Sequence, residues 1–191
     1  GVAQDWLHCN ALQYERGDGS ILLSIRHQDW IIKINYANGA GSGDTIWTMG
    51  QGGDFTINST DPYPWFSHQH DPGFLQGSNK VLAMFDNGNT RVSQQGGDSR
   101  GYVLQVDETN RTVTPILLAD LGFFSQALGS AQLLTNGDWH FGAGFGNTNP
   151  PFSQSIEVFP DGTLSFTIQT SGVRTYREFQ LPNLYTPPLK D

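Results

Sequence analysis

DWLHCNALQYERGDGSILLSIRHQDWIIKI, residues 5–34, is the stretch that decides the fold. Gly17, Asp18 and Gly19 lie between two segments rich in apolar, β-type residues. Because glycine and aspartate tolerate the backbone conformations of tight turns, this pattern predicts a β-hairpin. A third strand is expected at 30–35, so the stretch begins a series of short antiparallel strands.

The predicted hairpin brings polar side chains together. If the numbers of facing residues add up to about 36, Asn10 lies opposite Arg26 and His8 lies opposite Gln28. A register shifted by one residue pairs His8 with His27 instead, and the sequence does not decide between the two. A single histidine or arginine near a strand end is ordinarily solvated. An imidazole, a carboxamide and a guanidinium on one face, however, form a set suited to an anion such as sulfate, phosphate or carboxylate.

The composition favours an all-β protein. Of the 191 residues, 37% are apolar and only 15% are charged, with 23 glycines and 10 prolines, a balance typical of β-proteins with many turns. The net charge of −8 excludes a nucleic-acid partner, because polyphosphate binding needs a basic face. No apolar run reaches the ~20 residues of a membrane span, and no signal peptide is recognisable. Because the chain opens with Gly1 rather than Met, a processed product or a fragment is expected.

The single cysteine, Cys9, excludes an internal disulfide and any metal cluster built from cysteines. Its neighbour His8 points to the opposite face of a regular strand, which disfavours a nucleophilic pair of the two. Cys9 is therefore expected to be a small buried residue.

Short strands continue along the chain in groups of four. The first group ends at 45–49, before a long polar loop expected at 50–65. The second group carries a loop at 89–100. The expected strands of the second and third groups are 66–71, 80–88, 101–107, 113–119, 128–134, 139–142, 155–159 and 163–169.

An internal repeat relates the three groups. His8, His70 and Ser130 occupy similar places in the first strand of each group, 62 and 60 residues apart. Four-stranded meanders repeated at a steady period are typical of a β-propeller, whose first strands line a central channel. A β-sandwich is the alternative all-β fold, but it gives no reason for polar residues to recur in the first strands.

We therefore predict an all-β fold that forms part of a β-propeller. Its three blades are expected at 5–50, 66–120 and 126–172, with a closing strand and tail at 173–191. Closed propellers have about four to eight blades, so the rest of the ring is expected from a missing propeller half or from a homo-oligomer.

Four motifs carry a family resemblance. DWLHCN at 5–10, SIRHQ at 24–28, QHD at 69–71 and FDNG at 85–88 resemble the C-terminal half of bacterial arylsulfate sulfotransferases, as does the sixteen-residue step from Asn10 to Arg26. The likeness is specific in the first half of the chain and mainly architectural beyond residue 119. It implies that the propeller has six blades, of which this chain holds three.

The resemblance also implies an activity. It is the transfer of a sulfuryl group from a phenolic sulfate ester to a phenol, through a sulfated histidine and without a nucleotide donor, a metal or another cofactor. His70 would be the nucleophile, while His8, Asn10 and Arg26 would hold the sulfate oxygens. A neutral imidazole is one of the few side chains that form a covalent intermediate near neutral pH, and each preorganised donor can be worth roughly 3 kcal/mol. A further histidine is implied from the absent N-terminal half, so this chain is expected to need those blades for activity.

Other polar residues are weaker candidates for the site. His68 would share the face of His70 on a regular strand and is the rival nucleophile, but only His70 stands between Gln and Asp. Ser130 is a candidate hydrogen-bond donor to sulfate, with an ordinary strand serine as the simpler interpretation. The residues expected to be structural are His27, His140 and the turn formers Asp86 and Asn87.

Two other classes of function stay open. A propeller with the same anion pocket and the aromatic residues Trp30, Trp47 and Trp65 would bind an anionic or aromatic ligand without chemistry, and a scaffold would use its surface for protein contacts. The residue at position 70 discriminates between a transferase and a binding protein, because a binding protein would tolerate glutamine or asparagine there. The resemblance alone implies a periplasmic or extracellular location.

Overall fold

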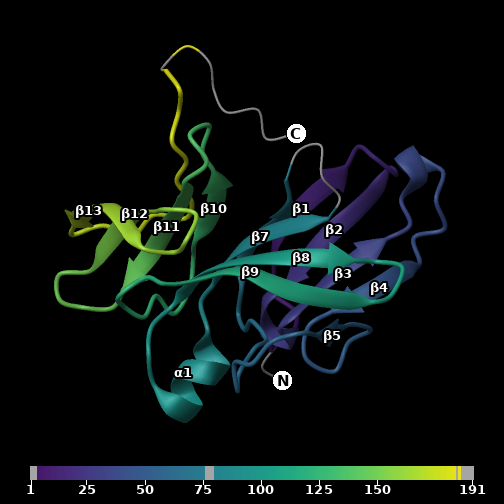
Figure 1. Cartoon of the computed structure of the whole chain (residues 1–191), viewed down its shortest axis with the longest axis horizontal. Coiled ribbons are helices and arrows are strands. Elements are labelled where there is room, and N and C mark those ends of the chain that lie inside the picture. Colours follow the sequence, from purple (N-terminus) through teal and green to yellow (C-terminus); the bar gives the residue numbers. More distant parts are fainter. Residues whose placement is uncertain (1–3, 76–79, 184, 186–191) are drawn as a thin grey trace.

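Three β-sheets follow one another along the chain like the blades of a propeller, as Figure 1 shows for the computed structural model. The structure describes residues 4–75, 80–183 and 185, so the end of the predicted tail, 184 and 186–191, lies outside the described residues. The first sheet contains, in spatial order, β1 (Cys9–Glu15), β2 (Ser20–Ile25), β3 (Trp30–Ile34) and β4 (Thr45–Met49). Short 3₁₀ helices at Arg26–Gln28 and Ala37–Gly39 connect its strands.

The second sheet has five strands where four were expected. The additional strand β5 (Thr56–Ile57) lies in the predicted loop and pairs in parallel with the outermost strand of the meander. The predicted loop at 89–100 contains a helix, α1 (Asn89–Gln95). The meander itself is β6 (His70–Phe74), β7 (Val81–Asp86), β8 (Arg100–Asp107) and β9 (Thr112–Asp120).

The third sheet is a plain antiparallel meander. Its strands are β10 (Ser130–Leu133), β11 (Trp139–Gly146), β12 (Phe152–Val158) and β13 (Leu164–Ser171). All residues of β13 are exposed, and the strand lies at an outer edge of the molecule (Figure 1). The segment 174–179, expected to be a strand, is irregular. Side chains of β10, rather than a strand ladder, hold it in place, because Ser130 and Gln132 bond the backbone of Glu178 and Gln180.

Side-chain alternation packs the sheets against each other. In β7, Met84 belongs to a core cluster shared with the first sheet, whereas Phe85 belongs to a cluster shared with the third. The second contact is close, since a Cβ on Gly101 would lie 2.3 Å from the ring of Phe141. Trp47, which was considered a ligand-binding aromatic residue, is 1% exposed in the first cluster and therefore belongs to the core.

Between Ala11 and Glu15 the opening hairpin has the shifted register of the two predicted, and it departs from that register only at Asn10. Glu15 pairs with Ser20 across a turn at 16–19, and from Ala11 onward facing residues add up to 35 rather than 36. An irregularity at Asn10 then shifts the pairing, so that Cys9 faces Ile25. The bulge uses one extra residue of β1, and the main chain of His8 consequently accepts a hydrogen bond from Arg26 N at 3.1 Å. Asn10 and Arg26 are therefore not a facing pair.

Two further expectations at the strand ends are wrong. Cys9 is exposed rather than buried, because β1 is the edge strand of its sheet. The meander of the second sheet begins at His70 and not at residue 66. Backbone groups of Ser67 and His68 bond the carboxylates of Asp86 and Asp29 instead of a neighbouring strand.

The first strands of the three sheets lie side by side, with β6 in contact with both β1 and β10. His8 precedes β1, while His70 and Ser130 begin β6 and β10. The polar residues of the internal repeat therefore meet at one end of this inner layer. Among the described residues, no helix is long and apolar enough to cross a membrane.

Candidate active site

His70 is the central buried residue at that end of the inner strands. It is the first residue of β6, pairs with Phe85 of β7, and is 2% exposed. Asp71, which follows it, has a left-handed backbone with φ 54° and forms an ion pair with Arg177 at 3.0 Å. The inner strand thus departs from regular geometry where the imidazole is placed.

Two oxygen atoms fix the protonation of His70. Its Nδ1 lies 2.6 Å from Asn87 Oδ1 and 3.1 Å from the carbonyl oxygen of His68. Both oxygens are acceptors, so Nδ1 carries the proton and donates it. The Nε2 atom is then left with a lone pair, the form that a nucleophilic imidazole requires.

Asn87 is held in the orientation that this tautomer needs. Its Nδ2 donates to the carbonyl oxygens of Ser125 at 2.7 Å and Leu128 at 3.0 Å. With the amide nitrogen committed to these carbonyls, Oδ1 must face His70. The side chain is fully buried, so the arrangement is shielded from water.

The lone pair of His70 faces the loop before β10. The backbone N–H of Leu128 donates to Nε2 at 3.2 Å. Leu128 has φ 65°, and the next residue, Gly129, has φ 149° and lies where a Cβ would come within 2.6 Å of Phe85. Only glycine fits there without displacing the aromatic ring, so close packing presses this loop against the imidazole.

Burial keeps the imidazole neutral. The pKa of His70 falls from 6.5 to about 4, chiefly because of burial and with smaller contributions from the nearby Arg26 and His8. The hydrogen bond to Asn87 acts in the opposite direction and raises the pKa. His70 is therefore an unprotonated base at neutral pH, next to two cationic or cation-forming side chains.

The low pKa of His70 predicts a pH-dependent stability. An unfolded histidine titrates near 6.5, so the folded protein should lose stability as the pH falls from 6.5 through about 4, by up to about 3 kcal/mol. Urea unfolding of the wild type and His70→Asn at pH 7.5 and pH 5 measures this loss of unfolding free energy. We expect a smaller pH-dependent loss in the variant. Equal losses in both proteins would show that His70 does not resist protonation.

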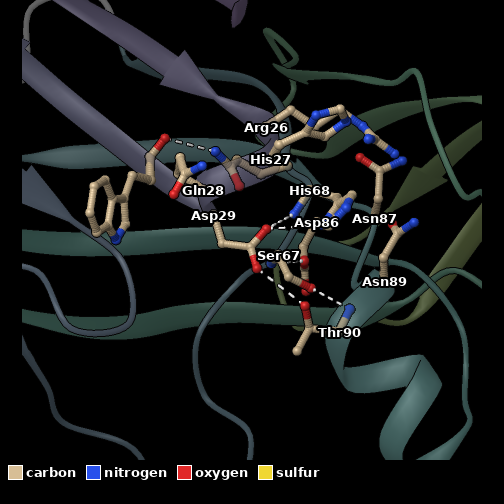
Figure 2. Close-up of polar contacts among 12 residues, drawn as sticks. Arg26, His27, Gln28, Asp29, Ser67, His68, Asp86, Asn87, Asn89 and Thr90 are labelled. Carbon is tan, nitrogen blue, oxygen red and sulfur yellow. Dashed lines mark hydrogen bonds and ion pairs between the residues drawn. The ribbon is translucent and has the colours of Figure 1, made fainter. Parts of the chain in front are cut away.

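Arg26 supplies a half-buried cation on the same side. It begins the 3₁₀ helix after β2, where its Nη2 donates to the carbonyl oxygen of Gln126 at 2.8 Å. Asn89 donates to the same oxygen at 3.1 Å, and Figure 2 shows both side chains beside Asn87. Among the residues that the structure describes, none bonds the buried Nε of Arg26, so this guanidinium retains a donor for an anion.

His8 and Asn10 differ in how they are held. His8 is exposed, has a left-handed backbone with φ 51°, and bonds the Asp5 carboxylate through Nδ1. Asn10 is buried, and its Nδ2 donates to the carbonyl oxygen of Gln69 at 2.7 Å. Asn10 therefore contacts the residue just before His70, while His8 is near enough to affect the pKa of His70.

His68 is placed differently from His70. Its backbone N and its Nδ1 both bond Asp29 Oδ1, at 2.7 Å and 3.0 Å. The other oxygen of Asp29 accepts a bond from Thr90, and these contacts are drawn in Figure 2. The expectation that His68 shares a strand face with His70 is wrong, because His68 precedes β6 and has φ 55°.

Ser130 and the remaining histidines lie in other surroundings. The Ser130 hydroxyl donates to the backbone carbonyl of Glu178 at 2.7 Å. His27 stacks obliquely between His8 and His68, with ring centroids 4.9 Å and 5.8 Å away. His140 is buried on the third sheet, 3.4 Å from a Glu178 carboxylate oxygen.

Asp86 and Asn87 are not the turn formers that the sequence predicts. Asp86 is fully buried at the end of β7, where it bonds Arg100 at 2.9 Å and the backbone of Ser67. Asn87 orients the imidazole of His70. Asp86 ends, and Asn87 follows, the strand that pairs with β6, and the pairing of His70 with Phe85 is the signal that would have placed Asn87 beside His70.

A separate groove of about 570 Å³ runs between the inner strands. Tyr14 and Phe74 line it together with Asp71, and Arg177 closes it on the side of the histidine by bonding Asp71 and the Asn10 carbonyl. His70 does not line this groove. The reacting imidazole would therefore be reached from the end where the inner strands begin.

Comparison with known proteins gives one family. A family model described as Arylsulfotransferase (ASST) matches residues 1–177. A search of curated proteins finds no match. The matched region contains all three sheets and every residue of the site around His70.

Proposed function

The chain belongs to the arylsulfotransferase family, and on that premise we propose that it transfers a sulfuryl group from a phenolic sulfate ester to a phenol through a sulfated His70. The observation that carries this proposal is the buried, neutral imidazole whose Nδ1–H is held by Asn87. This tautomer leaves the lone pair on Nε2, where a nucleophile needs it.

In the first displacement, the His70 Nε2 lone pair attacks the sulfur atom of the donor. The N–S bond forms as the S–O bond to the aryl group breaks, and the phenolate leaves with the electron pair. Since Nδ1 keeps its proton, the ring becomes a sulfo-imidazolium cation. The Asn87 carbonyl oxygen accepts the hydrogen bond from that cation and stabilises it.

Positive charge and N–H donors would hold the sulfuryl oxygens during both displacements. Arg26 has an uncommitted Nε, Asn10 an amide group, and His8 an exposed imidazole at the same end of the inner strands. The Leu128 N–H, now 3.2 Å from Nε2, would transfer its hydrogen bond to a sulfuryl oxygen once the lone pair is used. Such preorganised donors are commonly the largest contribution to catalysis.

The second displacement reverses the first with a different phenol. The acceptor oxygen attacks sulfur, the N–S bond breaks, and the electron pair returns to His70 Nε2. The proton lost by the acceptor balances the one gained by the departed phenolate. No net proton, electron or nucleotide is consumed, so the cycle needs only the donor and the acceptor.

The number of blades and the location of the protein are further proposals that rest on the family. Six blades would close the ring, and the exposed apolar residues of β13, among them Leu164, Phe166 and Ile168, fit an edge on which another blade packs. The missing blades would come from a propeller half outside these residues or from another copy. We place the protein in the periplasm or outside the cell.

The test is an acceptor-dependence assay. The chain, with and without the upstream half of the propeller, is incubated with p-nitrophenyl sulfate in the presence and absence of phenol, and nitrophenol release and phenyl sulfate are measured. We expect phenyl sulfate to form in step with nitrophenol and only when phenol is present. Binding of the ester without any transfer by the completed propeller would identify a binding protein instead.

A further inference from the structure

A cluster of three metal-ligating side chains lies beside the proposed sulfate site. Asp5, His8 and His27 each offer one ligand atom, and these atoms lie within 4.8 Å of one another. We propose that this cluster binds a zinc ion and that the bound ion inhibits sulfuryl transfer by withdrawing His8 from the reaction. Metal binding stands on the geometry alone, whereas the inhibition rests on the proposed function.

The backbone brings the three residues together. Arg26 N bonds the His8 carbonyl at 3.1 Å, and His27 N bonds the Leu7 carbonyl at 3.2 Å, so the approach to β1 is paired with the 3₁₀ helix after β2. This pairing continues the opening hairpin beyond its bulge. The backbone of two of the ligands, His8 and His27, is therefore held by this pairing.

The side chains already converge. His8 Nδ1 bonds the Asp5 carboxylate, the His27 ring bonds the Asp5 backbone carbonyl, and the two imidazole centroids are 4.9 Å apart. His8 holds this position with φ 51°, a backbone conformation that few residues other than glycine adopt without a compensating contact. A metal would replace the direct contact between the Asp5 carboxylate and His8 Nδ1.

The donor set selects zinc among common ions. Two imidazoles and one carboxylate suit Zn²⁺, at ligand distances of about 2.0–2.2 Å, whereas Mg²⁺ and Ca²⁺ prefer oxygen ligands. Asp5 and His8 are exposed and His27 is half-buried, so solvent can complete a tetrahedral site. An open site of this kind exchanges its metal readily, as an inhibitory site must.

Occupancy would compete with the reaction. With zinc bound at Nδ1, His8 would keep only its Nε2–H for the sulfuryl group, and its ring could no longer turn toward the donor. The ion would also fix His8 to Asp5 and His27, away from the donor. Transfer should therefore fall as zinc binds and return after chelation.

The experiment measures binding without substrate. Zinc chloride is titrated calorimetrically into wild type, His27→Asn, Asp5→Asn and Asp44→Asn, the last replacing an exposed carboxylate outside the cluster. We expect one zinc per chain in wild type and Asp44→Asn, and at least a tenfold weaker affinity in the first two variants. Unchanged affinity in folded His27→Asn would overturn the proposal, and circular dichroism checks the fold.

A second measurement tests the consequence for transfer. Phenyl sulfate formation by the completed propeller is followed against zinc concentration in wild type and His27→Asn, whose residue has no part in the proposed reaction. We expect the variant to need at least tenfold more zinc for half inhibition. Stoichiometric zinc binding with undiminished transfer would instead refute the inhibition and the role of His8, and leave the metal site standing.

Discussion

Replacement of His70 by asparagine is expected to lower sulfuryl transfer by ~10³-fold or more, because the variant has no nucleophile to form the covalent intermediate. Asparagine keeps a polar side chain at the start of β6 and can still bond Asn87. The fold should therefore survive. The measurement is the initial rate of phenyl sulfate formation by the completed propeller, with unfolding in urea as the check on stability.

His68→Asn is the matched control for this variant. His68 bonds Asp29 and lies two residues away, outside β6, so its loss should leave most of the transfer activity. Wild type quenched after exposure to donor alone should carry a sulfuryl group on the peptide that contains His70. Transfer that survives in His70→Asn and disappears in His68→Asn would move the nucleophile to His68.

Replacement of Asn87 by alanine is expected to lower kcat by about 10–100-fold with a smaller change in KM. The variant loses the acceptor that keeps the proton on His70 Nδ1, so the unreactive tautomer becomes populated. It also removes the Asn87 donor from two carbonyl oxygens, that of Leu128 and that of Ser125, which keeps a 3.3 Å bond from Ser99, and this should cost about 1–3 kcal/mol of unfolding free energy.

A pH profile separates positioning of the histidine from a loss of packing. The bond to Asn87 raises the pKa of His70, so the acidic limb of the kcat profile should move to lower pH in Asn87→Ala. Asn89→Ala is the control, since Asn89 also bonds the 125–128 loop but contacts Gln126. An acidic limb that stays in place in Asn87→Ala would show that Asn87 acts only on stability.

The strand pattern of this protein follows from its sequence. Gly17, Asp18 and Gly19 predicted the first hairpin, and the repeat of His8, His70 and Ser130 predicted three sheets that present these residues at one end. These features depend on turn residues and on side-chain alternation, which act over a few residues. The β5 strand and helix α1 escaped prediction because each is short and lies within a polar segment.

The sequence predicted which residues lie at the site better than it predicted how they are arranged. Arg26 and His8 do lie near His70, but through a bulge at Asn10 that neither predicted register contained. A bulge depends on the side chains that pack against a strand, and the residues of the turn do not predict it. Asp86 and Asn87 were misread for a similar reason, since the motif Asp-Asn-Gly has the same appearance in an exposed turn and at a buried strand end.

By itself, the sequence determined that the protein is all-β and that its strands repeat in three groups, and its resemblance to a family pointed to His70 as the proposed nucleophile. Only the tertiary structure decided the tautomer and the pKa of His70. Its protonation depends on Asn87, 17 residues away, and on Leu128, 58 residues away, and its pKa depends on burial between sheets. These contacts form only when distant strands pack, so no local pattern encodes them.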